Sequence, residues 1–119
     1  MSCETDTDLT DFFVNNTKSV KLTIKVNGEA EDITGSIVTL TLKANEDDPD
    51  SEAVIQKDGT ILNQVTDKGG VLILLTPTDT DIDPGDYYYD VQWIDSTGQL
   101  YTVDKGKIRA KKRITDKTS

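Results

Sequence analysis

The side chains that perform most enzyme chemistry are scarce in this chain. Its 119 residues include no histidine, which removes the commonest general base. The one cysteine, Cys3, stands in a polar N-terminal stretch and has no histidine to activate it as a nucleophile. Carboxylates are so numerous that finding two near each other carries little information, and no glycine-rich phosphate loop is present. We therefore predict a protein that is not an enzyme and that uses no cofactor.

One acidic stretch is similar to the start of a calcium-binding loop. Residues 79–86 read Asp-Thr-Asp-Ile-Asp-Pro-Gly-Asp. Pro84 moves the glycine of such a loop by one position, and Asp90 stands where the closing glutamate is needed. The stretch therefore predicts a solvated acidic loop, with a weak calcium site as the alternative, and we assign no residue as a metal ligand. The acidic residues 45–52 predict a second solvated loop.

Basic residues recur at every second position near the C-terminus. They are Lys105, Lys107, Arg109, Lys111 and Arg113. In an extended strand all five lie on one face, which allows three interpretations. The strand is an edge strand protected by charge, it docks against an acidic surface such as that of another copy, or it binds nucleic acid. The third is the least favoured, because no aromatic residues interleave with the basic ones.

The charge of the chain is divided unevenly. The net charge is −9, yet residues 101–119 hold 7 of the 13 basic residues and only 2 of the 22 acidic ones. An acidic body disfavours general binding to nucleic acid, which requires contacts from Lys and Arg to phosphates. We expect no membrane-spanning segment and no signal peptide, since no apolar run is long enough. A single cysteine excludes an internal disulfide and fits assembly in a reducing cytoplasm.

Short alternating segments separated by turn residues predict an all-β fold. Asn27-Gly28 and Asp58-Gly59 have the composition of hairpin turns. The expected strands cover residues 20–26, 36–43, 53–57, 61–65, 71–75, 86–94 and 99–114, and the apolar run 71–75 suits a central strand. About seven to eight strands at this spacing predict a single immunoglobulin-like antiparallel β-sandwich without a disulfide.

The stretch before and within residues 86–94 supports that fold. Asp83, Gly85 and Tyr87 have the spacing of a tyrosine corner, in which a tyrosine hydroxyl bonds to the backbone a few residues upstream. Alternation places Tyr87, Tyr89 and Trp93 on one face, which we assign to the core. The sequence leaves open whether Tyr87 or Tyr89 makes the corner bond.

The chain divides into a sandwich and two flanking segments. We predict a flexible N-terminal arm over residues 1–17, the sandwich over residues 18–114 and a C-terminal tail over residues 115–119. The arm contains Phe12, Phe13 and Val14, an apolar patch that could dock on this domain or on a neighbouring copy. These three residues and the five alternating basic residues are the candidate docking residues.

Several motifs together resemble a known family. They are Asp32-Ile33-Thr34-Gly35 before a strand, Gly85-Asp86-Tyr87-Tyr88-Tyr89-Asp90-Val91 within one, the turn Asp95-Ser96-Thr97-Gly98, and Gly106-Lys107-Ile108 in the last strand. Over residues 18–114 the chain resembles the small immunoglobulin-like domains of tailed-phage structural proteins, such as the N-terminal domain of baseplate upper proteins. These motifs define a core and a corner, and they do not define a site.

The resemblance implies a non-enzymatic structural protein of a phage or prophage particle, in the tail or baseplate. Capsid decoration or the head-to-tail junction is the alternative location. The expected partners are other virion proteins and copies of the chain itself, without membrane or nucleic acid, and the expected location is the virion after synthesis in the host cytoplasm. A second alternative is a module that binds carbohydrate or a host surface through Tyr88 and Tyr101.

Overall fold

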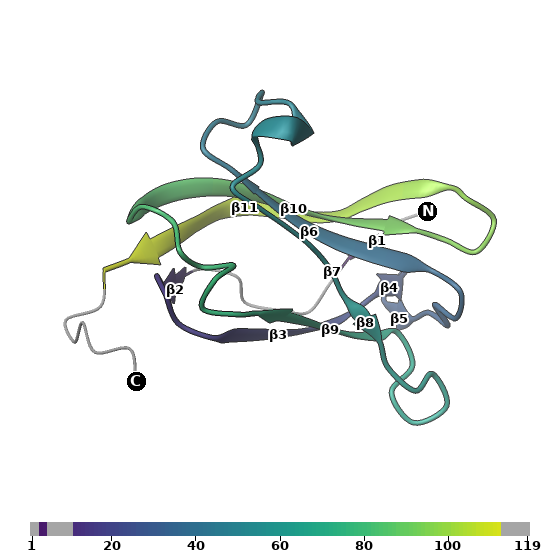
Figure 1. Ribbon diagram of the computed structural model, residues 1–119. Coiled ribbons are helices and arrows are strands. Elements are labelled where there is room, and N and C mark those ends of the chain that lie inside the picture. Colours follow the sequence, from purple (N-terminus) through teal and green to yellow (C-terminus); the bar gives the residue numbers. More distant parts are fainter. Residues whose placement is uncertain (1–2, 5–10, 113–119) are drawn as a thin grey trace.

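Two β-sheets face each other in the computed structural model, which describes residues 3–4 and 11–112 (Figure 1). The larger sheet has the strand order β2-β11-β10-β6-β7, and the smaller one has the order β3-β9-β8. A third small sheet, β1-β4-β5, lies at one end. The all-β sandwich without a disulfide is confirmed, and its architecture is immunoglobulin-like.

The strands have the following bounds. The larger sheet consists of β2 (Asp11–Phe13), β11 (Leu100–Lys111), β10 (Gly85–Ile94), β6 (Ile37–Lys43) and β7 (Ile55–Asp58). The smaller sheet consists of β3 (Lys18–Thr23), β9 (Gly70–Leu75) and β8 (Thr60–Ile61). The third consists of β1 (Cys3–Glu4), β4 (Lys25–Val26) and β5 (Glu29–Ala30), and η1 (Asp50–Glu52) is a short 3-10 helix.

The core forms where the apolar faces of the two sheets meet. Alternation along each strand directs one set of side chains inward and leaves the other set toward solvent. The expected central position of the run 71–75 is confirmed, because β9 pairs with β3 on one side and with β8 on the other. The fully buried apolar side chains are Leu22, Ile24, Ile33, Val38, Leu40, Leu42, Val71, Ile73, Leu75 and Val91.

The tyrosine corner is present and Tyr87 makes it. The Tyr87 hydroxyl donates a hydrogen bond of 2.6 Å to the carbonyl oxygen of Asp83. Gly85 between them has a φ of 152°, a backbone conformation that favours glycine. Burial raises the pKa of the Tyr87 phenol above its usual range, with a smaller contribution from the Asp83 charge. The bond therefore joins the start of β10 to the loop that precedes it.

Tyr89 and Trp93, the other two aromatic residues of β10 that we assigned to the core, face inward as predicted, but to different extents. Trp93 is buried, and its ring centroid lies 5.0 Å from that of Tyr101. Tyr89 is half-buried against Gly106, where an added Cβ would lie 3.3 Å from its ring, a tight contact, and its hydroxyl donates to Asp104 Oδ2 at 3.1 Å. The glycine in β11 therefore makes room for Tyr89, as an aromatic residue does when it covers a strand glycine.

The segment around Phe12 belongs to the sandwich, which differs from the predicted boundary at residue 17. Strand β2 pairs in parallel with the end of β11, and the Val14 amide donates to the Lys111 carbonyl oxygen at 3.0 Å. Phe12 is 3% exposed and Val14 is also buried, whereas Phe13 is 45% exposed. Phe12 and Val14 therefore dock on their own domain and are not available to a partner. Residues 1–2, 5–10 and the predicted tail over 115–119 lie outside the described residues.

One of the two predicted hairpin turns is wrong. Asn27 and Gly28 both have positive φ, at 53° and 84°, and join β4 to β5 in a hairpin as expected. Gly59, in contrast, lies where the chain crosses from one sheet to the other, since β7 pairs with β6 and β8 pairs with β9. A Cβ built on Gly59 would lie 2.5 Å from Val71 Cγ2. Because Gly59 has no side chain, the main chain can pass close to Val71 as it crosses between the two sheets. The chain does not form a hairpin at this point.

Candidate functional site

A β-bulge decides which side chains of β11 face outward. Val91 pairs with Asp104 but Gln92 pairs with Thr102, so Val103 is an extra residue in β11. A bulge of one residue moves the alternation to the other set of positions. Before the bulge Thr102 is exposed, and after it Lys105 and Lys107 are exposed. The bulge therefore places Lys105 and Lys107 on the same outer face as Thr102.

A tyrosine lies between two lysines on that outer face. Tyr88 in β10 pairs with Lys43 in β6 on one side and with Lys107 in β11 on the other. The Lys107 ammonium lies 5.5 Å from the centroid of the Tyr88 ring. In the next row along the strands, Asp90 pairs with Thr41 and with Lys105 in the same way. Three neighbouring strands thus form two polar rows, of which the first is basic and aromatic.

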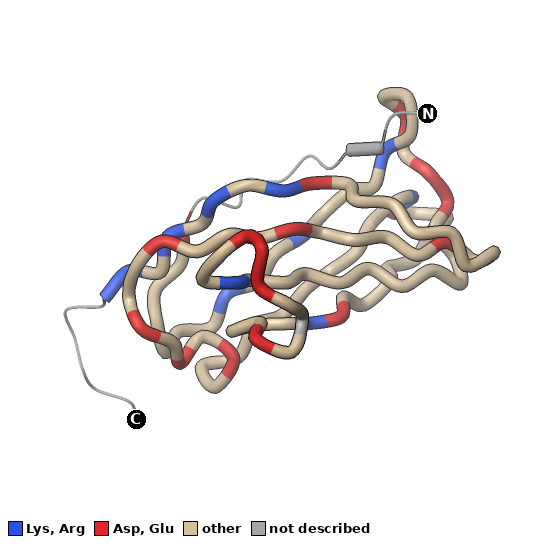
Figure 2. Tube along the Cα trace, turned by 90° about the horizontal axis from the view of Figure 1, so that it is seen from above, with Lys and Arg blue, Asp and Glu red and all other residues tan. Residues whose placement is uncertain are grey.

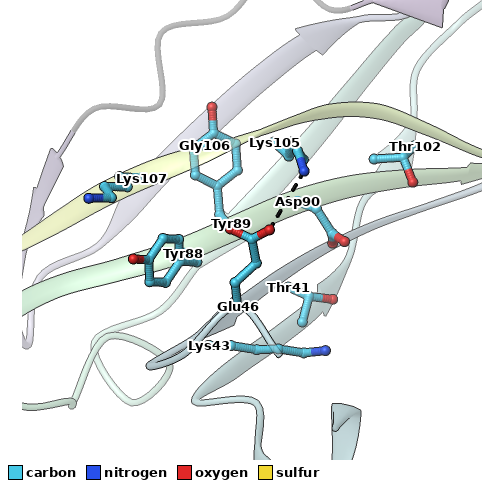
Figure 3. A pocket seen from close by; sticks show the side chains of 10 residues that line it. All are labelled: Thr41, Lys43, Glu46, Tyr88, Tyr89, Asp90, Thr102, Lys105, Gly106 and Lys107. Atoms are coloured by element: carbon cyan, nitrogen blue, oxygen red, sulfur yellow. Dashed lines mark ion pairs between the residues drawn. The ribbon is translucent and has the colours of Figure 1, made fainter. Parts of the chain in front are cut away.

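The loop over residues 44–54 turns the flat face into a groove. It rises above the larger sheet and carries η1 (Figure 1). Glu46 of this loop reaches over the strands toward Lys105, with 3.7 Å between its Oε1 and the lysine Nζ (Figure 3). The groove has a volume of about 470 Å³ and is lined by Thr41, Lys43, Glu46, Tyr88, Tyr89, Asp90, Thr102, Lys105, Gly106 and Lys107. We call this feature the outer-face groove.

The predicted docking residues of β11 face outward, but most of them are paired with acids of their own chain. Figure 2 shows the basic positions recurring along the strand that leads to the C-terminus. Arg109 Nε donates to Asp86 Oδ1 at 2.9 Å, and this bond holds the pKa of Asp86 below its usual range. Lys111 bridges Asp11 at 2.8 Å and lies over the ring of Phe13.

These pairs change two of the sequence interpretations. Strand β11 pairs with β10 along its length but with β2 only over Arg109–Lys111, so among the described residues its end is covered and the stretch 100–108 stays at the edge of the sheet. Lys107, at the centre of the predicted set, stacks on Tyr88 in the outer-face groove. Arg113 lies outside the described residues. The structure therefore brings Lys105 and Lys107 to the groove and leaves Arg109 and Lys111 in ion pairs beyond it.

Two acids of the stretch 79–86 have structural roles. Asp79 Oδ2 accepts a hydrogen bond of 2.8 Å from the Thr76 amide and lies 3.1 Å from Lys57 Nζ. The hydrogen bond from the Thr76 amide lowers the pKa of Asp79 below its usual range, and the Lys57 side chain makes a smaller contribution in the same direction. Asp83 supplies the carbonyl of the tyrosine corner. The described part of the chain holds no group of three or more His, Cys, Asp or Glu residues placed to bind a metal ion.

A second hollow, of about 220 Å³, lies beside Trp93 and also has a structural explanation. Two of its carboxylates belong to turns. Asp32 accepts hydrogen bonds from the Thr34 amide and hydroxyl, and Asp95 accepts them from Thr97 in the same way. These acids stabilise the turns in which they lie, so we do not treat the hollow as the functional site.

Sequence reasoning missed the part of the groove contributed by β6 and its loop. Alternation in residues 37–43 places Thr41 and Lys43 opposite the core set Val38, Leu40 and Leu42, so their outward direction was readable. Their position beside Tyr88 could not be predicted, because the order and register of the strands do not follow from the sequence of one strand. The reach of Glu46 over the sheet depends on a loop whose path no local pattern predicts.

No protein-family model and no curated protein matches this chain. Solved structures similar to it include CopC from Methylosinus trichosporium OB3b, at 14% identity, covering 95% of this chain and 97% of that one, with a TM-score of 0.53. The soluble domain of PmoD from a Methylocystis species has 11% identity, coverages of 85% and 77%, and a TM-score of 0.50. A family 76 glycoside hydrolase from a bovine Bacteroides thetaiotaomicron strain has 11% identity and a TM-score of 0.51, and the match covers 92% of this chain but 20% of that one.

These likenesses show the fold, and they correct the function expected from the sequence. CopC, the soluble domain of PmoD and the glycoside hydrolase are not phage structural proteins. The expectation of a virion protein in a phage tail, baseplate, capsid or head-to-tail junction is therefore wrong. The motifs that suggested it are those of the sandwich core and its corner, which unrelated proteins share. The part of the chain with assigned structure contains no helix of the length and hydropathy that a membrane span requires.

Proposed function

We propose that this chain is a non-enzymatic binding domain whose outer-face groove receives an acidic segment of a partner protein. The observation that carries the proposal is the row Lys43–Tyr88–Lys107 across three neighbouring strands, beneath the loop that holds Glu46. The row places a lysine on each strand beside a tyrosine, with the Lys107 ammonium against the ring, which suits a carboxylate side chain attached to an apolar stem.

The local charge supports an acidic ligand. Three lysines and two carboxylates line the groove, whereas the whole chain has a net charge of −9. The pair between Lys105 and Glu46 is long, at 3.7 Å, and both side chains are mostly exposed. Such a pair contributes at most about 1 kcal/mol, so a carboxylate of the partner can replace Glu46 at little cost. The groove is therefore a basic site on an acidic protein.

The lining of the groove gives no reason to expect catalysis. It contains no histidine and no cysteine, and its hydroxyl groups belong to threonines and tyrosines without a neighbouring imidazole. A nucleophile needs an adjacent base or a lowered pKa to react. Binding is therefore the activity that the groove supports.

The residues of this chain do not fit a copper site. Copper sites in proteins are built from imidazole, thiolate and thioether groups. This sequence has no histidine, one cysteine and one methionine. The chain lacks the ligands for a copper site of that kind, so we derive no function through copper.

The proposal is tested by binding of a fluorescently labelled peptide that alternates glutamate and threonine, measured by anisotropy at low ionic strength. We expect saturable binding that Lys107→Glu weakens by about tenfold, which corresponds to about 1.4 kcal/mol. Lys21→Glu is the matched control, because Lys21 is exposed on β3 of the other sheet and the change in net charge is the same. Equal weakening by both variants would mean that only net charge matters, and it would refute a site at the groove.

A further inference from the structure

A row of exposed apolar side chains crosses the same outer face at its other end. Ile94, the last residue of β10, pairs with Ile37 in β6 and with Leu100 in β11. Ile37 is 49% exposed, Leu100 is 56% exposed and Ile94 is half-buried. We call these three residues the apolar row. Single exposed apolar residues are ordinary on a protein surface, but three adjacent ones on neighbouring strands form a patch.

The apolar row is continuous with the outer-face groove. Between them lies a row made of Thr39, Gln92 and Thr102, whose side chains are polar and uncharged. Tyr88 and Ile94 are six positions apart along β10, which corresponds to about 20 Å at the rise of a strand. One face therefore carries a basic end, a neutral middle and an apolar end in a straight line along the strands.

We infer that the partner segment lies extended along this face and places an acidic side chain in the groove and an apolar side chain on the apolar row. This inference rests on the proposed function and adds the form of the ligand. The argument for an acidic segment is charge complementarity with Lys43, Lys105 and Lys107. Burial of an apolar side chain on the apolar row adds a favourable term to the binding free energy, which an ion pair exposed to water contributes only weakly.

The extended form follows from the spacing of the rows. An extended segment advances by the same distance per residue as the strands beneath it, so side chains six positions apart in the segment match Tyr88 and Ile94. Its alternate side chains then face the sheet, and the others face solvent. A helix advances by only about 1.5 Å per residue and would need about 13 residues to cover the same span. The Glu46 side chain reaches across this path to Lys105, so the acidic side chain of the segment takes the place of Glu46 where it enters the groove.

The test uses labelled peptides of about nine residues in which glutamate and leucine are six positions apart on a background of serine and threonine. A control peptide has the same composition with the two residues only two positions apart. We expect the first peptide to bind wild-type protein about fivefold more tightly than the second, as partial burial of one leucine side chain provides. The Leu100→Thr variant should bind the two peptides with equal affinity.

The matched control is Leu74→Thr, because Leu74 is 47% exposed on β9 of the smaller sheet. It should leave the advantage of the first peptide unchanged. If the first peptide shows no advantage while the glutamate–threonine peptide binds and depends on Lys107, the inference fails and the proposed function stands. If neither peptide binds, the proposed function fails as well. If sedimentation shows a dimer that Leu100→Thr dissociates, a second copy covers the apolar row and the inference is overturned.

Discussion

Replacing Phe12 with alanine should destabilise the sandwich much more than the same change at its neighbour Phe13. The two residues are adjacent in β2, but alternation directs Phe12 into the core, where it is 3% exposed, and Phe13 outward, where it is 45% exposed. The comparison tests whether the pairing of β2 with β11 holds the N-terminal segment in the fold. The same substitution at neighbouring positions also keeps the change in composition identical.

The expected magnitudes follow from burial. Removing a fully buried phenylalanine side chain costs about 3–5 kcal/mol, because the transfer free energy is lost and a cavity remains. Phe13 is partly in water and stacks under the Lys111 ammonium at 5.5 Å, so its removal should cost about 1 kcal/mol or less. Since small domains have unfolding free energies of about 5–15 kcal/mol, the Phe12 variant should lose a large fraction of its stability.

The assay is urea unfolding followed by the fluorescence of Trp93, the one tryptophan of the chain, which is buried in the native state. A lower midpoint with an unchanged slope would indicate a loss of stability in a two-state transition. Equal and small effects of both substitutions would mean that residues 11–13 are not a fixed part of the sandwich. That result would refute the assignment of β2 and would mean that the segment is a flexible arm.

Two further predictions concern the stability of the sandwich. Tyr87→Phe removes the bond to the Asp83 carbonyl and should cost about 1 kcal/mol in urea unfolding. Because burial raises the pKa of Tyr87 in the folded state, its contribution should be complete below about pH 10 and should be lost as the pH rises through the folded pKa. Wild-type protein should therefore lose more stability in alkali than Tyr87→Phe does, and parallel curves would contradict this. Gly59→Ala should cost about 1–3 kcal/mol, because the new methyl group meets Val71 in the core, and an unchanged melting temperature would show that no close crossing exists there.

Much of the fold was predictable because its determinants are local. The alternation in residues 86–94 identified the core face of β10, and the spacing from Asp83 to Tyr87 identified the corner. The Asn27-Gly28 turn was predictable for the same reason, since its residue types favour the positive φ that the hairpin requires. Local chemistry determines each of these features.

The features that the sequence did not predict depend on contacts between distant segments. Gly59 has the composition of a hairpin turn, but the partners of the strands on either side determine that it crosses between sheets. Phe12 was assigned to a mobile arm because its neighbours are polar, and a parallel pairing with residues nearly one hundred positions later determines its burial. The groove required the register of three strands together with the bulge at Val103.

We propose that the outer face of the larger sheet is the binding surface. The most direct test is to titrate isotopically labelled protein with the glutamate–threonine peptide and to follow every backbone amide signal by NMR. We expect the signals that shift most to belong to the groove, around Lys43, Tyr88 and Lys107, and those of β3 and β9 in the opposite sheet to be unaffected. Shifts spread evenly over all lysines, or confined to the smaller sheet, would contradict it.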